Sequence, residues 1–320
     1  MNNSLHEENK WLEDSLINKD QFEKMSAIRS GKIFSIFWEL QFALYIGVLL
    51  LTAGLGILIY KYIGSIGHIF AIFLMIGLTS WLFYYIFNRA EKYTNNHMVV
   101  PNAYFDYFTL LAALLVSLTI TYIEVQFEPF DAFWTYLPLI ISAVYFFLAY
   151  RFDHKGVLAL AIISLASFFG LNIQPDILDI DSMFNYHTYS YTGIVLGLLL
   201  ALGAFILARG DVKAHFKPIY MNFAAWLVFG GVLSGTINDG PISIIGFIGL
   251  LVSAACIYYA WLEKSTWFVL YGVIAAYILI TAMIIEASPD QFIFILSYYF
   301  IFTPILPILL IFRLNKAFKK

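Results

Sequence analysis

The chain alternates long apolar runs with short polar segments over most of its 320 residues. A transmembrane helix needs about 20 mostly apolar residues to cross roughly 30 Å of hydrocarbon. Ten runs of this kind occur, each closed by charged residues, Pro or Asn. They predict membrane spans at 41–60, 66–87, 104–123, 133–150, 157–173, 190–208, 219–237, 242–262, 266–285 and 292–312.

These runs are continuous, whereas the strands of a membrane barrel would be about 10 residues of alternating polarity. We therefore expect an all-α integral membrane protein. Residues 41–320 should form a ten-transmembrane-helix bundle, and residues 1–40 a short cytoplasmic amphipathic helical hairpin. A Pro-containing turn follows the third, fifth, seventh and ninth predicted spans, which indicates repeated helical hairpins. These prolines are Pro129, Pro175, Pro241 and Pro289.

The positive charges predict the orientation of the bundle. Loops on the cytoplasmic side of a membrane collect Lys and Arg. With ten spans, 17 of the 18 basic residues fall on one side, and only Lys61 falls on the other. We therefore expect a multi-pass protein of the bacterial inner (cytoplasmic) membrane with both termini in the cytoplasm.

The composition supports a membrane protein and excludes several functions. Hydrophobic residues make up 61% of the chain and charged residues 12%, against roughly 45–50% and about 25% in ordinary soluble domains. So few basic residues cannot form a face that binds nucleic acid. Cys256 is the single cysteine, so no intrachain disulfide forms. The sequence contains no HExxH, GxSxG, phosphate-loop or Cys/His motif, so we predict no catalytic residue, cofactor or metal site.

The first 60 residues resemble a known family. The segment Trp11–Gln21, followed by the Gly-spaced run Ile46–Gly56, is similar to the bacterial membrane proteins grouped as domain of unknown function 2157. Ser15 stands where that pattern would have a turn glycine. The resemblance implies a cytoplasmic helical hairpin followed by a polytopic bundle, and it implies no activity. The hairpin could rest on the inner leaflet or dock a cytoplasmic protein partner.

Acidic residues gather in the turns opposite the basic side. Carboxylates at the ends of outward-running helices would attract a cation or a cationic substrate. Alternatively, they are what remains in loops that exclude Lys and Arg. The members of this predicted outer acidic cluster are Glu124, Glu128, Asp131, Asp176, Asp239, Glu286 and Asp290.

Other candidates lie within the spans or at their ends. Gly193, Gly197 and Ala201 recur every four residues and predict a close helix contact, either within the chain or with a second subunit. The oligomeric state stays open. Pro304 and Pro307 predict a bend in the last span. The intramembrane or interfacial polar residues are Asp106, Asn172, Asn222 and Asn238.

These features favour permease-like handling of a small or lipid-like molecule. The alternative is a membrane-embedded sensor or assembly scaffold that acts through residues 1–40. An enzyme is the class with the least support.

Overall fold

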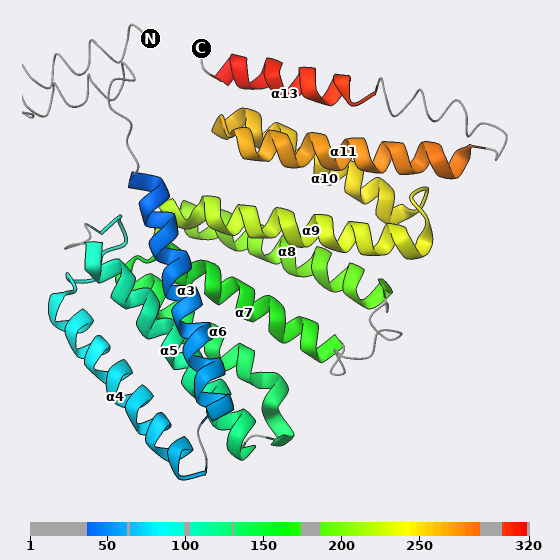
Figure 1. Ribbon diagram of the computed structural model, residues 1–320. Helices are drawn as coiled ribbons and strands as arrows, with labels where there is room; N and C mark the ends of the chain where they lie inside the picture. Colours follow the sequence, from blue (N-terminus) through cyan, green and yellow to red (C-terminus); the bar gives the residue numbers. More distant parts are fainter. Residues whose placement is uncertain are drawn as a thin grey trace, which may run out of the picture. The chain divides into compact units, whose positions relative to one another are not determined.

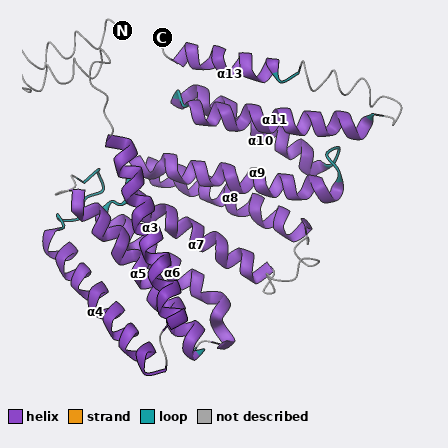
Figure 2. Cartoon of the chain, in the orientation of Figure 1, coloured by secondary structure: helices purple, strands orange, loops and turns teal. Residues whose placement is uncertain are grey.

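The computed structural model describes residues 37–62, 65–98, 103–129, 131–173, 186–288 and 303–318, and the regular structure in these ranges is helical (Figure 2). The predicted hairpin of residues 1–40 lies almost entirely outside the described residues. The chain divides into two compact units, residues 1–61 and 62–320, and each is described by itself. The described part of the first unit is helix α3, Phe37–Tyr62, which ends at the boundary.

The second unit contains the remaining described helices (Figure 1). They are α4 (Ser65–Arg89), α5 (Ala103–Phe127), α6 (Leu137–Phe152), α7 (Lys155–Ile173), α8 (Tyr186–Arg209), α9 (Lys217–Asp239), α10 (Ile244–Glu263), α11 (Thr266–Ala287) and α13 (Ile305–Phe318). Two short 3-10 helices, Asp131–Tyr136 and Ala214–Phe216, lead directly into α6 and α9.

The helices coincide with the predicted apolar runs from 41–60 to 266–285. Within the described residues, seven helices are long and apolar enough to cross a membrane. Two shorter apolar stretches, Phe42–Leu58 and Lys155–Gly170, lie in α3 and α7. The chain is therefore a multi-pass integral membrane protein with an all-helical fold.

Helices of the second unit pack mainly against their neighbours in sequence. Helix α4 contacts α5, α6 contacts α7, and α8 lies along most of α9. Helix α9 in turn packs against α10 and α11, and α13 packs against α11 (Figure 1). Local pairing of this kind is expected where short turns connect antiparallel helices.

Four of the described prolines lie in the first turn of a helix or directly before it. Pro138 and Pro218 lie in the first turns of α6 and α9, where the missing N–H has no intrahelical partner in any case. Pro304 directly precedes α13, and Pro307 lies in its first turn. Helix α13 begins at Ile305, and residues 289–302 lie outside the described residues, so the predicted bend at these two prolines stays a prediction.

Candidate functional site

An apolar groove runs along α9 between α8 and α10. Its cavity has a volume of about 420 Å³. Ala224 and Ala225 of α9 and Ala255 of α10 are among the lining residues, and α8 and α10 leave a hollow above α9. We call it the α8–α10 groove; its lining includes Leu198, Ala201, Phe205, Lys217, Ala224, Ala225, Val228, Val252, Ala255, Cys256, Tyr258, Tyr259, Leu262, Glu263 and Phe268.

The groove is closed at its far end by a tight contact between α8 and α9. A Cβ atom on Gly197 would lie 2.6 Å from Cγ2 of Val228 and 2.8 Å from the carbonyl oxygen of Ala224. A Cβ atom on Gly193 would lie 3.0 Å from the carbonyl oxygen of Leu227. The small residues predicted to pack therefore face α9 at these two positions, while Ala201 lines the groove.

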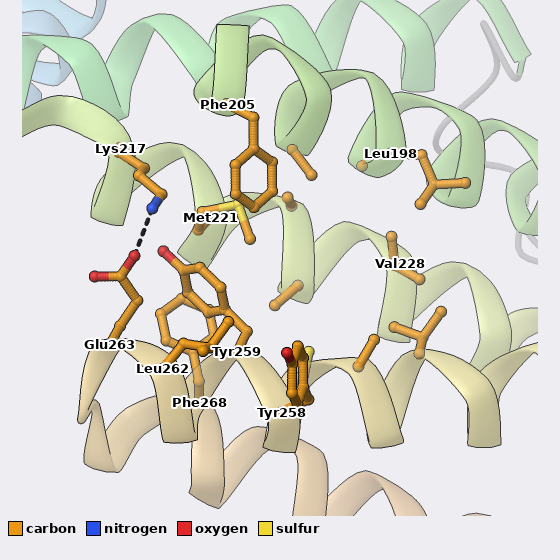
Figure 3. A pocket seen from close by; sticks show the side chains of 17 residues that line it. Leu198, Phe205, Lys217, Met221, Val228, Tyr258, Tyr259, Leu262, Glu263 and Phe268 are labelled. Atoms are coloured by element: carbon orange, nitrogen blue, oxygen red, sulfur yellow. Dashed lines mark hydrogen bonds and ion pairs between the residues drawn. The ribbon is translucent and has the colours of Figure 1, made fainter. Parts of the chain in front are cut away.

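The other end of the groove carries an ion pair. Nζ of Lys217, the first residue of α9, donates to Oε1 of Glu263, the last residue of α10, at 2.5 Å (Figure 3). The two residues meet because α9 and α10 are antiparallel neighbours. The Lys217 ammonium also lies 5.1 Å from the ring centre of Phe205 and 5.3 Å from that of Tyr259, within cation–π range.

The two charged groups differ in their access to solvent or lipid headgroups. The Lys217 side chain is 21% exposed, and the Glu263 side chain is 46% exposed. The groove is thus amphipathic, with a long apolar floor and a charged end. A second groove of about 470 Å³, lined by residues such as Trp226, Trp267 and Tyr271 between α9 and α11, has no charged residue in its lining.

A buried cluster of polar groups lies beyond the start of α9. Oδ1 of Asp153 accepts a hydrogen bond from Nε2 of His215 at 2.6 Å and lies 3.3 Å from Nζ of Lys213. Oδ2 of Asp153 accepts the N–H of Met98 at 2.6 Å. The Lys213 ammonium also donates to the carbonyl oxygen of Asn96 at 3.1 Å. We call this set, Asp153, Lys213, His215 and the backbone of Asn96 and Met98, the Asp153 node.

The Asp153 node joins three predicted cytoplasmic loops: the segment after α4, the turn between α6 and α7, and the turn between α8 and α9. The side chains of Lys213 and Asp153 are 0% and 2% exposed. Residues 213 and 153 both have left-handed backbones, with φ of 48° and 58°. The node therefore fixes the turn that leads into α9, four residues before Lys217.

His154 adjoins the node and caps α7. Its Nδ1 accepts the N–H of Val157 at 3.1 Å, and its Nε2 lies 3.0 Å from the carbonyl oxygen of Asp106. Complete burial lowers the pKa of His154, because desolvation penalises the imidazolium. The neutral imidazole matches both contacts, accepting at Nδ1 and donating from Nε2.

The described residues of the predicted outer acidic cluster lie in environments that differ from one residue to the next. Glu286 is held by the α9–α10 turn, where its Oε2 accepts the N–H of Ile242 at 2.7 Å. Glu124 is half-buried, whereas Glu128 and Asp239 are exposed. Asp131 begins the 3-10 helix before α6. Asp176 and Asp290 lie outside the described residues, and the convergence of the cluster stays a prediction.

The predicted intramembrane polar residues lie near helix ends. Asp106 is in the first turn of α5, and its carbonyl oxygen faces His154. Asn222 donates to the carbonyl oxygen of Pro218 at 2.8 Å. Its Oδ1 is buried without a hydrogen-bond partner in the described part of the chain. Asn172 and Asn238 lie in the last turns of α7 and α9.

Sequence reasoning missed the groove and the node. It used Lys213 and Lys217 only as markers of the cytoplasmic side. One signal was available, since Asp153 and Glu263 are acids in otherwise basic loops. Among the described residues, no group of three or more His, Cys, Asp or Glu is arranged to hold a metal ion.

Comparison of the chain with family models, with curated proteins and with solved structures finds no match. The resemblance of the first 60 residues to domain of unknown function 2157 therefore stays a prediction.

Proposed function

We propose that this protein is a ten-span protein of the bacterial inner membrane with both termini in the cytoplasm. The distribution of basic residues supports this topology, because α4, α6 and α8 have an Arg in their last turns and Lys264 directly follows α10. In this orientation the Asp153 node and the Lys217–Glu263 pair lie at the cytoplasmic surface.

We further propose a permease-like function in which the α8–α10 groove takes up a single-chain, lipid-like amphiphile. The observation that carries this proposal is an apolar groove with one charged end, placed at the start of a membrane-spanning helix. Its volume falls in the range of about 300–1,000 Å³ that is typical of small-molecule sites.

The groove suits a hydrocarbon chain. From Lys217 to Val228 it follows α9 over about 17 Å, at 1.5 Å per residue. Leu198, Tyr258 and Leu262 line it and are exposed on the helix surfaces, so a chain could enter sideways from the bilayer. The lipid tails of the surrounding bilayer are as apolar as the lining of the groove. The contact area and the fixed polar end must therefore provide the selectivity for the bound amphiphile.

The binding test uses native mass spectrometry of the full-length protein with 16-carbon lysophosphatidylglycerol as the probe. We expect one tightly bound molecule per chain. Ala255→Phe should abolish it, because Ala255 lines the groove and is exposed, so the ring fills the hollow without entering the protein core.

Ala254→Phe is the matched control, since Ala254 is exposed on the same helix and does not line the groove. Equal binding by both variants would refute the groove as the site. Transbilayer movement is tested separately in proteoliposomes with a fluorescent lysolipid and an impermeant quencher. Binding without faster movement than in protein-free vesicles would contradict the permease-like part of the proposal.

A further inference from the structure

We propose that the α8–α10 groove selects amphiphiles with an anionic headgroup, which binds Lys217 in place of Glu263. This inference rests on the proposed function, because it assumes that a chain occupies the groove. It adds the chemical class of the headgroup and the residue that recognises it.

The unequal exposure of the two partners decides which charge a ligand must bring. Lys217 is 21% exposed and enclosed by Phe205 and Tyr259, so its ammonium needs a counter-ion close by. Glu263 is 46% exposed and can turn into solvent at little cost. An anion that displaces Glu263 therefore leaves no enclosed charge unpaired.

A cationic headgroup would have the opposite effect. By pairing with Glu263 it would leave the less exposed ammonium of Lys217 without a partner. An uncompensated charge with reduced access to water costs more free energy than one at the surface.

The surrounding charges also favour an anion. At this end, in α8, α9 and α10 or in the turns directly after α8 and α10, lie Arg209, Lys217 and Lys264, against Asp211 and Glu263. A small excess of positive charge raises the local concentration of anions. The ammonium then provides a charge-assisted hydrogen bond to a phosphate or carboxylate oxygen.

The test measures equilibrium binding of two lipids with the same 16-carbon chain to the full-length protein in neutral detergent. The anionic probe is lysophosphatidylglycerol, and the neutral probe is monopalmitoylglycerol, which has no phosphate. We expect the anionic lipid to bind about tenfold more tightly, as one charge-assisted hydrogen bond allows. Inorganic phosphate in millimolar excess should not compete, because it lacks the chain that fills the groove.

Two variants of the ion pair, each with its own control variant, assign the effect to Lys217 and Glu263. Lys217→Gln should abolish the preference by weakening lysophosphatidylglycerol binding, and Lys264→Gln should keep the preference. Glu263→Gln should tighten lysophosphatidylglycerol binding several-fold, because it removes the competing carboxylate, whereas Asp211→Asn should not.

Equal affinity of the wild-type protein for the two lipids, or a preference retained in Lys217→Gln, would overturn the headgroup inference while the proposed function stands. Competition by inorganic phosphate alone would also overturn it, since the site would then recognise a free anion. Failure of both lipids to bind would instead refute the proposed function.

Discussion

The ammonium of Lys213 lies 3.3 Å from a carboxylate oxygen of Asp153, with both side chains almost completely buried. The two residues are 60 positions apart in the sequence and lie in turns between different helix pairs. Their contact joins the turn after α6 to the turn that leads into α9. The contact between Lys213 and Asp153 therefore fixes the position of the start of α9, including Lys217, relative to the neighbouring helices.

Asp153→Asn should destabilise the protein strongly. The neutral amide leaves Lys213 buried without a counter-ion, and breaking one side of a buried ion pair costs about 3–5 kcal/mol. Thermal unfolding in detergent measures the effect, and the control is Asp211→Asn, an exposed residue of the turn that contains Lys213. The double variant Asp153→Asn, Lys213→Met should regain part of the loss; additive losses would contradict the pairing.

Stability should fall at acidic pH because of His154. Burial lowers its pKa below the ordinary value of 6.5 in the folded protein, so the unfolded chain binds more protons just below that pH. The free energy of unfolding therefore decreases as the pH drops below about 6.5 and is restored as it rises again. Comparing melting temperatures at pH 8 and pH 5.5 measures this change.

His154→Asn is the control for that experiment. Asparagine can cap α7 without titrating, so this variant should lose less stability between the two pH values than the wild-type protein. An equal loss in both would assign the pH dependence to other groups.

Two glycines of α8 should respond in opposite ways to the same substitution. Gly197→Ala places a methyl group 2.6 Å from Val228 and should destabilise the α8–α9 contact. A Cβ atom on Gly203 would have no such neighbour within 4 Å, so Gly203→Ala should gain up to about 1 kcal/mol of helix propensity. Melting temperatures that move in the same direction would contradict the close approach of α9 at Gly197.

Glu286 should stabilise the α9–α10 turn. Its Oε2 accepts the N–H of Ile242, and its carboxylate approaches Gly240, which has a φ of +80°. Glu286→Ala should lower stability by about 1 kcal/mol, the net value of one such hydrogen bond. Glu128→Ala, an exposed acid of the same predicted outer surface, should have almost no effect. A similar loss in both variants would mean that the contact with the turn contributes nothing.

The ten-span topology predicts opposite labelling of cysteines at the two ends of the helices. In a Cys256→Ser background, an impermeant thiol reagent added outside intact cells should label cysteines at one set of exposed positions and not the other. The labelled set is 128, 239 and 287, and the protected set is 92, 211 and 264. Labelling of the second set would contradict the orientation.

The sequence predicted the helices from α3 to α11 well because each apolar run is long and closed by charged or Pro residues. Helix α11, for example, occupies Thr266–Ala287 against the predicted 266–285. The contact at Gly197 follows a pattern of small residues that is visible within one helix. Such features depend on local spacing, which a single sequence contains.

The groove and the node could not be predicted in the same way. Lys217 and Glu263 are 46 residues apart in the sequence, and nothing near either residue identifies its partner. Ala201 continues the Gly193–Gly197 spacing, yet it lines the groove. Which small residue meets a helix and which borders a hollow depends on the positions of α8 and α10 along α9.

The most direct test of the account is to locate a bound chain by photo-crosslinking. A lysophosphatidylglycerol with a diazirine on its 16-carbon chain is irradiated with the full-length protein, and the labelled peptides are identified by mass spectrometry. The account predicts labels on residues that line the α8–α10 groove, such as Leu198, Val252 and Tyr258, and their loss in Ala255→Phe but not in Ala254→Phe. Labels spread evenly over exposed helix surfaces, or concentrated at Trp226 and Trp267 in the uncharged groove, would contradict it.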